Sequence, residues 1–190
     1  MIDVEEVAAS PETDAEIEKI AEEVEQGRDS YTLPEELVED PGADRQPSKN
    51  LLAQIAALST GEKLKLAMKG HRDARTLLIR DANRIVRRFV LLNPRISEEE
   101  IIALAKNRSI DRELLDLVCK KKEWVSNYQI KLALVTNPKT PVGIALRLVV
   151  TLLPRDLRQL AKSKNVPVAV NGVAKRLIIE RSGGHVEKRG

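Results

Sequence analysis

The spacing of apolar residues along the chain limits its fold more than any other feature. From Ser48 onward, apolar residues recur at three- and four-residue spacing, and residues that begin or end helices interrupt them about every 10 to 15 residues. No run alternates with a period of two over five residues, and aromatic residues, which favour strands, make up 2% of the chain. The sequence therefore predicts an all-α fold of short antiparallel helices.

Several helix boundaries can be placed from capping residues. Ser97 and Glu100 form a capping box, and Thr140 with Pro141 is expected to supply the N-cap and the first residue of a helix. The helix over 141–152 is apolar almost all round, so we expect it to be central and covered on several sides, with Gly143 permitting close packing. The other expected helices cover 48–58, 60–70, 72–80, 82–92, 110–120, 123–136, 154–163 and 167–180.

The chain divides near residue 48 into two parts of opposite charge. Residues 1–48 carry 16 acidic and three basic residues, whereas residues 49–190 carry 13 acidic and 29 basic residues. Because the first part contains four prolines and few large apolar side chains, it is expected to be a largely disordered acidic arm. Residues 49–182 are then a basic helical repeat domain, and 183–190 a flexible tail.

Within this arm, residues 14–26 are expected to form a helix, with Thr13 and Glu16 as a capping box. Its apolar stripe contains Ile17, Ile20 and Val24. Since the arm is acidic and the remainder basic, we expect this stripe to dock on the basic domain, either in the same chain or in another copy. Such docking would make the arm an autoinhibitory or assembly switch.

Similar residues recur at the expected helix ends. The pairs Leu66-Ala67, Leu104-Ala105 and Leu160-Ala161 lie near the end of a helix, and Asn93-Pro94 and Asn137-Pro138 both follow a helix that stops at Asn. At these residues, over about 60–181, the chain resembles bacterial HEAT-like and leucine-rich-repeat-variant α-helical repeat proteins. The resemblance implies a stacked helical array used as a binding surface. The sequence leaves open whether the helices form an α-solenoid or a compact array.

Two basic groups are candidates for binding an anion or a protein partner. The first would lie along one side of a nearly continuous helix around residue 82, and consists of Arg80, Arg84, Arg87 and Arg88. The second lies at a helix end with two aromatic residues nearby, and consists of Lys120, Lys121, Lys122, Trp124 and Tyr128. Nucleic-acid phosphates, an acidic protein segment or the arm itself would suit these groups. Solvated basic faces and aromatic core packing are the alternatives.

The chain lacks the residue patterns of familiar enzymes and metal sites. Cys119 is its single cysteine, its two histidines are far apart, and no Gly-rich phosphate loop or Gly-x-Ser-x-Gly turn is present. His71 is expected to be a turn or cap residue, and Cys119 a buried, inert thiol. We therefore expect no enzymatic activity, no cofactor and no bound metal.

These observations favour a non-enzymatic helical-repeat adaptor that binds a protein partner, with nucleic-acid binding through the basic residues as the alternative. The N-terminus has no basic region followed by an apolar one, and the longest apolar run, 144–153, is broken by Arg147. A cytoplasmic protein without membrane association is therefore expected. Self-association through the N-terminal arm is a further expectation.

Overall fold

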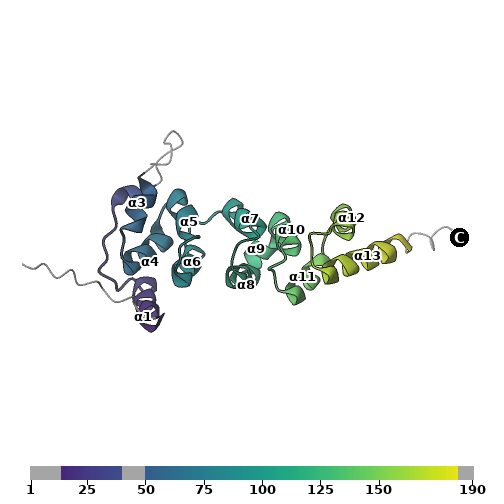
Figure 1. Ribbon diagram of the computed structural model, residues 1–190, viewed down its shortest axis with the longest axis horizontal. Helices are drawn as coiled ribbons and strands as arrows, with labels where there is room; N and C mark the ends of the chain where they lie inside the picture. Colours follow the sequence, from purple (N-terminus) through teal and green to yellow (C-terminus); the bar gives the residue numbers. More distant parts are fainter. Residues whose placement is uncertain (1–13, 40–49, 184–190) are drawn as a thin grey trace, which may run out of the picture. The chain divides into compact units, whose positions relative to one another are not determined.

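The computed structural model describes residues 14–39 and 50–183, which form helices and no strand (Figure 1). The prediction of an all-α fold is confirmed. The described residues fall into two compact units, the first ending at Arg95 and the second beginning at Ile96. The predicted domain boundary at residue 48 lies outside the described residues, and helices on both sides of that gap belong to the first unit. Within these ranges, no helix is both long enough and apolar enough to span a membrane.

The first unit is built around one central helix, α4, which contacts α1, α2, α5 and α6. Apolar side chains of α4 and α6, among them Leu64, Leu66 and Phe89, are fully buried where these helices meet. Its described helices are α1 (Asp14–Glu25), α2 (Glu35–Val38), α3 (Leu51–Ala56), α4 (Thr60–Lys69), α5 (Arg72–Leu78) and α6 (Arg84–Val90).

Helices α1 and α2 come from the segment that was predicted to be a largely disordered arm. Ile17 and Val24 are buried, Ile20 is half-buried, and α1 packs on α4 and α6 of the same chain. Leu37 of α2 is also buried, and its carbonyl accepts a hydrogen bond from the His71 N–H at 3.1 Å. The predicted helix over 14–26 is confirmed as α1, and its apolar stripe packs on the same chain. The expectation of disorder is wrong for the residues that follow up to 39, because Leu37 of α2 is also buried on this chain. Residues 1–13, including the predicted cap Thr13, and 40–48 lie outside the described residues.

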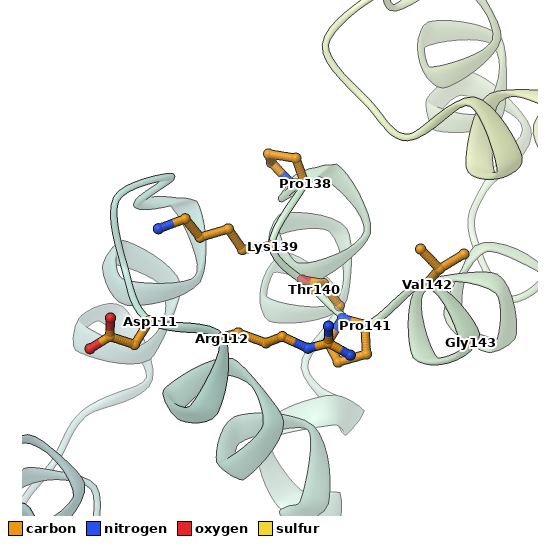
Figure 2. A pocket seen from close by; sticks show the side chains of 8 residues that line it. All are labelled: Asp111, Arg112, Pro138, Lys139, Thr140, Pro141, Val142 and Gly143. Atoms are coloured by element: carbon orange, nitrogen blue, oxygen red, sulfur yellow. The ribbon is translucent and has the colours of Figure 1, made fainter. Parts of the chain in front are cut away.

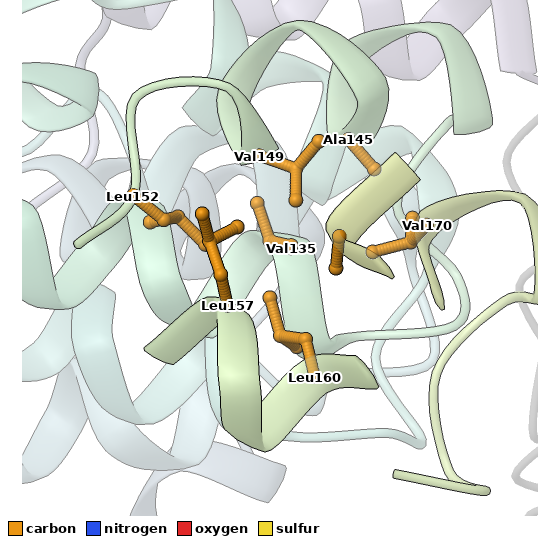
Figure 3. Packing of buried hydrophobic residues seen from close by; sticks show 8 residues of the cluster. Val135, Ala145, Val149, Leu152, Leu157, Leu160 and Val170 are labelled. Atoms are coloured by element: carbon orange, nitrogen blue, oxygen red, sulfur yellow. The ribbon is translucent and has the colours of Figure 1, made fainter. Parts of the chain in front are cut away.

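The second unit has a core shared by its last four helices, in which Val135, Val149, Leu157 and Val170 meet (Figure 3). Helix α10 contacts α7, α9 and α11, and α13 contacts α11 and α12. Its described helices are α7 (Glu98–Lys106), α8 (Arg112–Lys120), α9 (Lys122–Ser126), α10 (Tyr128–Thr136), α11 (Val142–Val149), α12 (Pro154–Lys162) and α13 (Val168–Gly183). The predicted tail lies outside the described residues beyond Gly183.

The helix predicted over 123–136 is interrupted at Asn127. Its side-chain oxygen accepts hydrogen bonds from the N–H groups of Gln129 and Ile130, at 2.8 and 3.3 Å, and so caps the start of α10. The prediction of one continuous helix is wrong because this local cap competes with helix continuation. The predicted capping box of Ser97 and Glu100 is confirmed at the start of α7.

An asparagine side chain closes each recurring Leu-Ala helix end; Asn93 and Asn137 are buried, and Asn171 is half-buried. In every case the side-chain amide donates to backbone carbonyls at the end of an earlier helix, where carbonyls lack partners within the helix. The donor–acceptor pairs are Asn93 with Ala67 (3.0 Å) and Gly70 (3.2 Å), Asn137 with Ala105 (2.8 Å) and Asn107 (3.0 Å), and Asn171 with Leu160 and Ala161 (2.9 Å each). We call these contacts the asparagine clamps.

Helix α11 was expected to be central and covered on several sides, and it is covered less completely than this. Ala145 and Val149 are buried against the unit's core, but Val142 and Val150 remain 46% and 45% exposed. A Cβ atom added to Gly143 would meet nothing within 4 Å, so this glycine does not serve close packing. Helix α11 packs mainly against α10 and α13, and Val142, Gly143, Arg147 and Val150 remain exposed on it.

Candidate functional site

The first predicted basic group is Arg80, Arg84, Arg87 and Arg88. Its expected helix is interrupted, because α5 ends at Leu78 and α6 begins only at Arg84. In the turn between them, Asp81 and Asn83 each accept a backbone N–H bond at 2.8 Å, which explains the break. Arg80 therefore lies in the turn and is exposed, as is Arg84, while Arg88 is half-buried. The predicted single basic side is wrong.

Arg87 has a structural role at this break. Its guanidinium donates to the carbonyls of Asp81 and Ala82 and so ties the turn to α6. A side chain held in this way presents less of its charge to a ligand than the sequence suggested.

The second basic group surrounds a buried tryptophan. Lys120 and Lys122 are exposed, whereas the Lys121 ammonium lies 4.1 Å from the centroid of the Trp124 ring, a cation–π contact. Burial lowers the pKa of Lys121, and the nearby Glu123 carboxylate partly offsets this effect. Trp124 is only 7% exposed, so its ring has no free face on which a nucleic-acid base could stack.

Tyr128 joins α10 to the start of α12. Its hydroxyl donates to the Asp156 carboxylate and accepts the backbone N–H of Leu153 at 3.1 Å. Burial and the hydrogen bond to Asp156 raise the pKa of Tyr128 above its ordinary value. The phenol is therefore a structural bridge, and neither predicted aromatic is available as a stacking platform.

The other candidate chemical groups also have structural roles. His71 Nδ1 accepts the N–H groups of Asp73 and Ala74, at 3.1 and 3.4 Å, which confirms it as the cap of α5. Cys119 is half-buried, and burial raises the pKa of its thiol to about 11, so the thiol is protonated at neutral pH. Across the described residues, no His, Cys, Asp and Glu side chains gather in a group that could hold a metal ion.

A cleft in the second unit gathers residues that sequence reasoning did not assign to a site. It has a volume of about 630 Å³ and lies between the start of α8 and the start of α11 (Figure 2). Arg112 and Lys139 bring positive charge to it, and Lys139 also donates to the Ser109 carbonyl at 3.2 Å. The full lining consists of Asp111, Arg112, Pro138, Lys139, Thr140, Pro141, Val142 and Gly143.

Both helices begin at this cleft without a side-chain cap. At α11 the N-cap position is taken by Pro141, and Thr140, which was expected to cap the helix, lies one residue too early. The Thr140 side chain is 2% exposed, and its hydroxyl has no hydrogen-bond partner in the part of the chain that the structure describes. In Figure 2 this oxygen points to the side of the cleft on which Lys139 and Asp111 lie. The cleft therefore offers unused hydrogen-bonding groups beside positive charge.

No protein-family model, characterised protein or solved structure matches this chain. One helix start in the first unit, that of α4, can be compared with the start of α11 at the cleft.

The start of α4 in the first unit shows how such a position is closed. Ser59 caps the helix, with Glu62 completing a capping box. The ring of Tyr31 lies directly on Gly61, the second residue of α4, so closely that a Cβ there would overlap it. The absence of a side chain at Gly61 thus allows the segment 29–31 to lie against the helix.

One turn further along α4, Lys65 holds the same segment. Its ammonium lies 2.7 Å from Asp29 Oδ1 and also donates to the Tyr31 carbonyl. Burial by itself would raise the pKa of Asp29, but hydrogen bonds from Lys65 and from the Tyr31 N–H outweigh it and hold the pKa below its ordinary value. Gly61 receives the aromatic ring and Lys65 receives the carboxylate.

Helix α11 has the same two residue types at the same positions. Gly143 is its second residue and Arg147 its sixth, as Gly61 and Lys65 are in α4. Both Gly143 and Arg147 are exposed. A glycine four residues before a basic residue at a helix start was the sequence signal that could have identified this site.

Proposed function

We propose that this chain is a non-enzymatic helical-repeat adaptor that binds a protein partner through the exposed residues of α11. The observation that carries this proposal is the apolar surface left exposed there, at Val142 and Val150 and at Leu153 just after the helix. Val168 and Ile179 of α13 are also exposed in this unit, but neither lines the cleft, whereas Val142 of α11 does. Other large apolar side chains pack into the core shown in Figure 3. Exposed apolar side chains next to a polar cleft are typical of protein-interaction sites.

The asparagine clamps support a repeat architecture. Each of them closes a Leu-Ala helix end with an amide from further along the chain, and the same supporting contact is found at Asn93 in the first unit and at Asn137 and Asn171 in the second. We propose that the helices of each unit stack as in HEAT-like α-solenoids, which the resemblance in sequence implies. Such arrays commonly bind other proteins along their helices.

The chemistry of the titratable groups favours binding over catalysis. The Cys119 thiol, with its raised pKa, is a poor nucleophile, and Tyr128 and Asp156 are engaged with each other. The cytoplasmic location, the self-association and the switch role of the arm stay predictions, although α1 docks in the same chain.

Site-specific photo-crosslinking tests this function. A photoreactive amino acid at Val142 or Val150 is expected to give a discrete crosslinked protein in cells that produce the full chain. The same residue at Arg158, which is exposed on α12 in the same unit and does not line the cleft, is the matched control. Equal crosslinking from all three positions, or none from α11, would contradict the proposal.

The alternative function, nucleic-acid binding, has fewer residues available for it than the sequence suggested. Its stacking aromatics, Trp124 and Tyr128, are occupied within the protein, and Arg87 is engaged with backbone carbonyls. A phosphate-binding surface would still give duplex affinity that falls steeply with salt and that Arg84→Glu weakens. Salt-sensitive duplex binding of this kind, with no crosslinking from α11, would favour nucleic-acid binding over the adaptor.

A further inference from the structure

We propose that the Gly143/Arg147 pair on α11 binds an extended acidic segment of a partner protein, with an aromatic side chain two residues after a carboxylate. This inference rests on the proposed adaptor function and names the chemistry of the partner. The partner segment would lie on α11 as the segment 29–31 lies on α4.

The first argument is the internal template in the first unit. There, a glycine at the second helical position accepts the Tyr31 ring, and a lysine one turn later binds the Asp29 carboxylate at 2.7 Å. In α11, Gly143 and Arg147 repeat these positions, and four-residue spacing puts both on one side of the helix. Open space lies within 4 Å of the place where a Gly143 Cβ would stand, so a ring can rest there. The glycine otherwise weakens the helix without a packing benefit.

The adjoining cleft adds groups that suit an acidic chain segment. Arg112 and Lys139 outnumber Asp111, so the lining carries a net positive charge, and the start of α11 adds its uncapped N–H groups. The buried hydroxyl of Thr140 has no partner within the described residues and can bond to an entering group. A cleft of about 630 Å³, with apolar walls at Pro138, Pro141 and Val142, is larger than one inorganic anion requires. It fits several residues of a peptide.

The occupant is expected to be a different protein rather than a second copy. The corresponding segment of this chain is already held on α4 by Tyr31 and Asp29. Because that contact forms within one chain, a second copy would have to give it up before offering the segment to α11. A partner with a free segment of the same chemistry has no such cost.

The test uses a fluorescein-labelled peptide with the sequence of residues 29–36, which carries three carboxylates and no basic residue. It is titrated with the full chain and followed by fluorescence anisotropy. Binding is expected, and Arg147→Gln is expected to weaken it roughly fivefold by removing a charge-assisted hydrogen bond. Gly143→Ala is expected to weaken it similarly, since the new methyl group would occupy the space of the ring. Peptides carrying Asp29→Asn or Tyr31→Ala are expected to bind more weakly than the unchanged peptide.

Arg158→Gln is the matched control, because it removes an exposed arginine of the same unit away from the cleft. Gly143→Ala meets no neighbouring atom and should leave the protein folded, so lost binding cannot be ascribed to unfolding. The inference is overturned if the peptide does not bind, or if it binds equally to the Gly143→Ala, Arg147→Gln and Arg158→Gln proteins. Crosslinking from Val142 without peptide binding would overturn this partner chemistry alone, whereas loss of both would overturn the adaptor function as well.

Discussion

The helix starts of α4 and α11 share a glycine at the second position and a basic residue at the sixth, and they differ in what covers them. At α4, a capping box satisfies the first turn, the Tyr31 ring covers Gly61, and Asp29 pairs with Lys65. At α11, Pro141 provides no cap, the Thr140 hydroxyl has no partner among the described residues, and the surface around Gly143 is open. We call the start of α4, in the first unit, the closed start, and the start of α11, in the second unit, the open start.

The first N–H groups of α4 therefore find hydrogen-bond partners within the chain, whereas those of α11 need water or a ligand. A helix start left open loses the stabilisation that caps and covering side chains provide. Residues that break such local rules are expected where a protein binds something. Substitutions at the two helix starts can distinguish a start that its own chain covers from one that nothing within the chain covers.

The largest loss of stability is expected on replacing Asn137, whose side chain is one of the asparagine clamps and precedes α11 in the chain. Asn137→Ala removes the amide that bonds the Ala105 and Asn107 carbonyls and should lower the free energy of unfolding by about 2–3 kcal/mol, since buried carbonyls lose their partner. Urea unfolding of the full chain, followed by circular dichroism, measures the change. Asn165→Ala, at an exposed position, is the control and should cost less than about 0.5 kcal/mol. Equal costs at the two positions would mean that the clamp is not a support.

A smaller loss is expected at the closed start. Gly61→Ala should lower the free energy of unfolding by about 1–2 kcal/mol, because the added methyl group forces the Tyr31 ring away from α4. In a Tyr31→Ala background the same substitution should cost much less, since the obstructing ring is gone. This double-mutant cycle isolates the contact. Additive effects would show that the ring does not limit the residue at 61.

The Asp29 carboxylate, which pairs with Lys65 at the closed start, should make the free energy of unfolding depend on pH. The pKa of Asp29 is lowered in the folded protein, so its contribution is complete above the ordinary Asp pKa and is lost as the pH falls through the lowered value. For a partly exposed ion pair this contribution should be below about 1 kcal/mol. Asp29→Asn should therefore lower stability at neutral pH and flatten the acid side of the stability profile. Parallel profiles for the two proteins would contradict this account.

Much of the helical fold could be predicted because its signals are local. Apolar spacing and capping residues placed the helices to within a few residues, and the capping box at Ser97 appears as expected. The prediction failed where a second local signal competed, as at Asn127, which caps a new helix inside the expected one. The helix over 14–26 was predicted correctly, but the ordering of α2 was not, because Leu37 is buried against α4, which is distant along the chain.

The spacing of Gly143 and Arg147 is visible in the sequence, but their exposure could not be predicted because it depends on which other residues fail to contact them. Sequence reasoning assigned Thr140 a cap and Gly143 a packing role, and both assignments were reasonable from composition. Whether a ring covers a glycine, or a neighbour covers Val142, depends on residues distant along the chain. The basic residues were expected to be available to a ligand, but Arg87 and Lys121 make contacts within the protein that the sequence did not reveal.

The smallest effect, and the one of opposite sign, is expected at the open start. Gly143→Ala should raise the free energy of unfolding by about 0.5 kcal/mol, because alanine favours a helix over glycine and its methyl group meets no other atom within 4 Å. The same change at Gly61 is expected to destabilise, so the two glycines should respond with opposite signs in the same urea titration. A loss of stability at Gly143 would mean that something within the chain already covers this position, and α11 would then have no open face for a partner. A gain would show that Gly143 lowers the stability of the folded protein. Such a cost is expected where a glycine leaves room for a side chain of a binding partner.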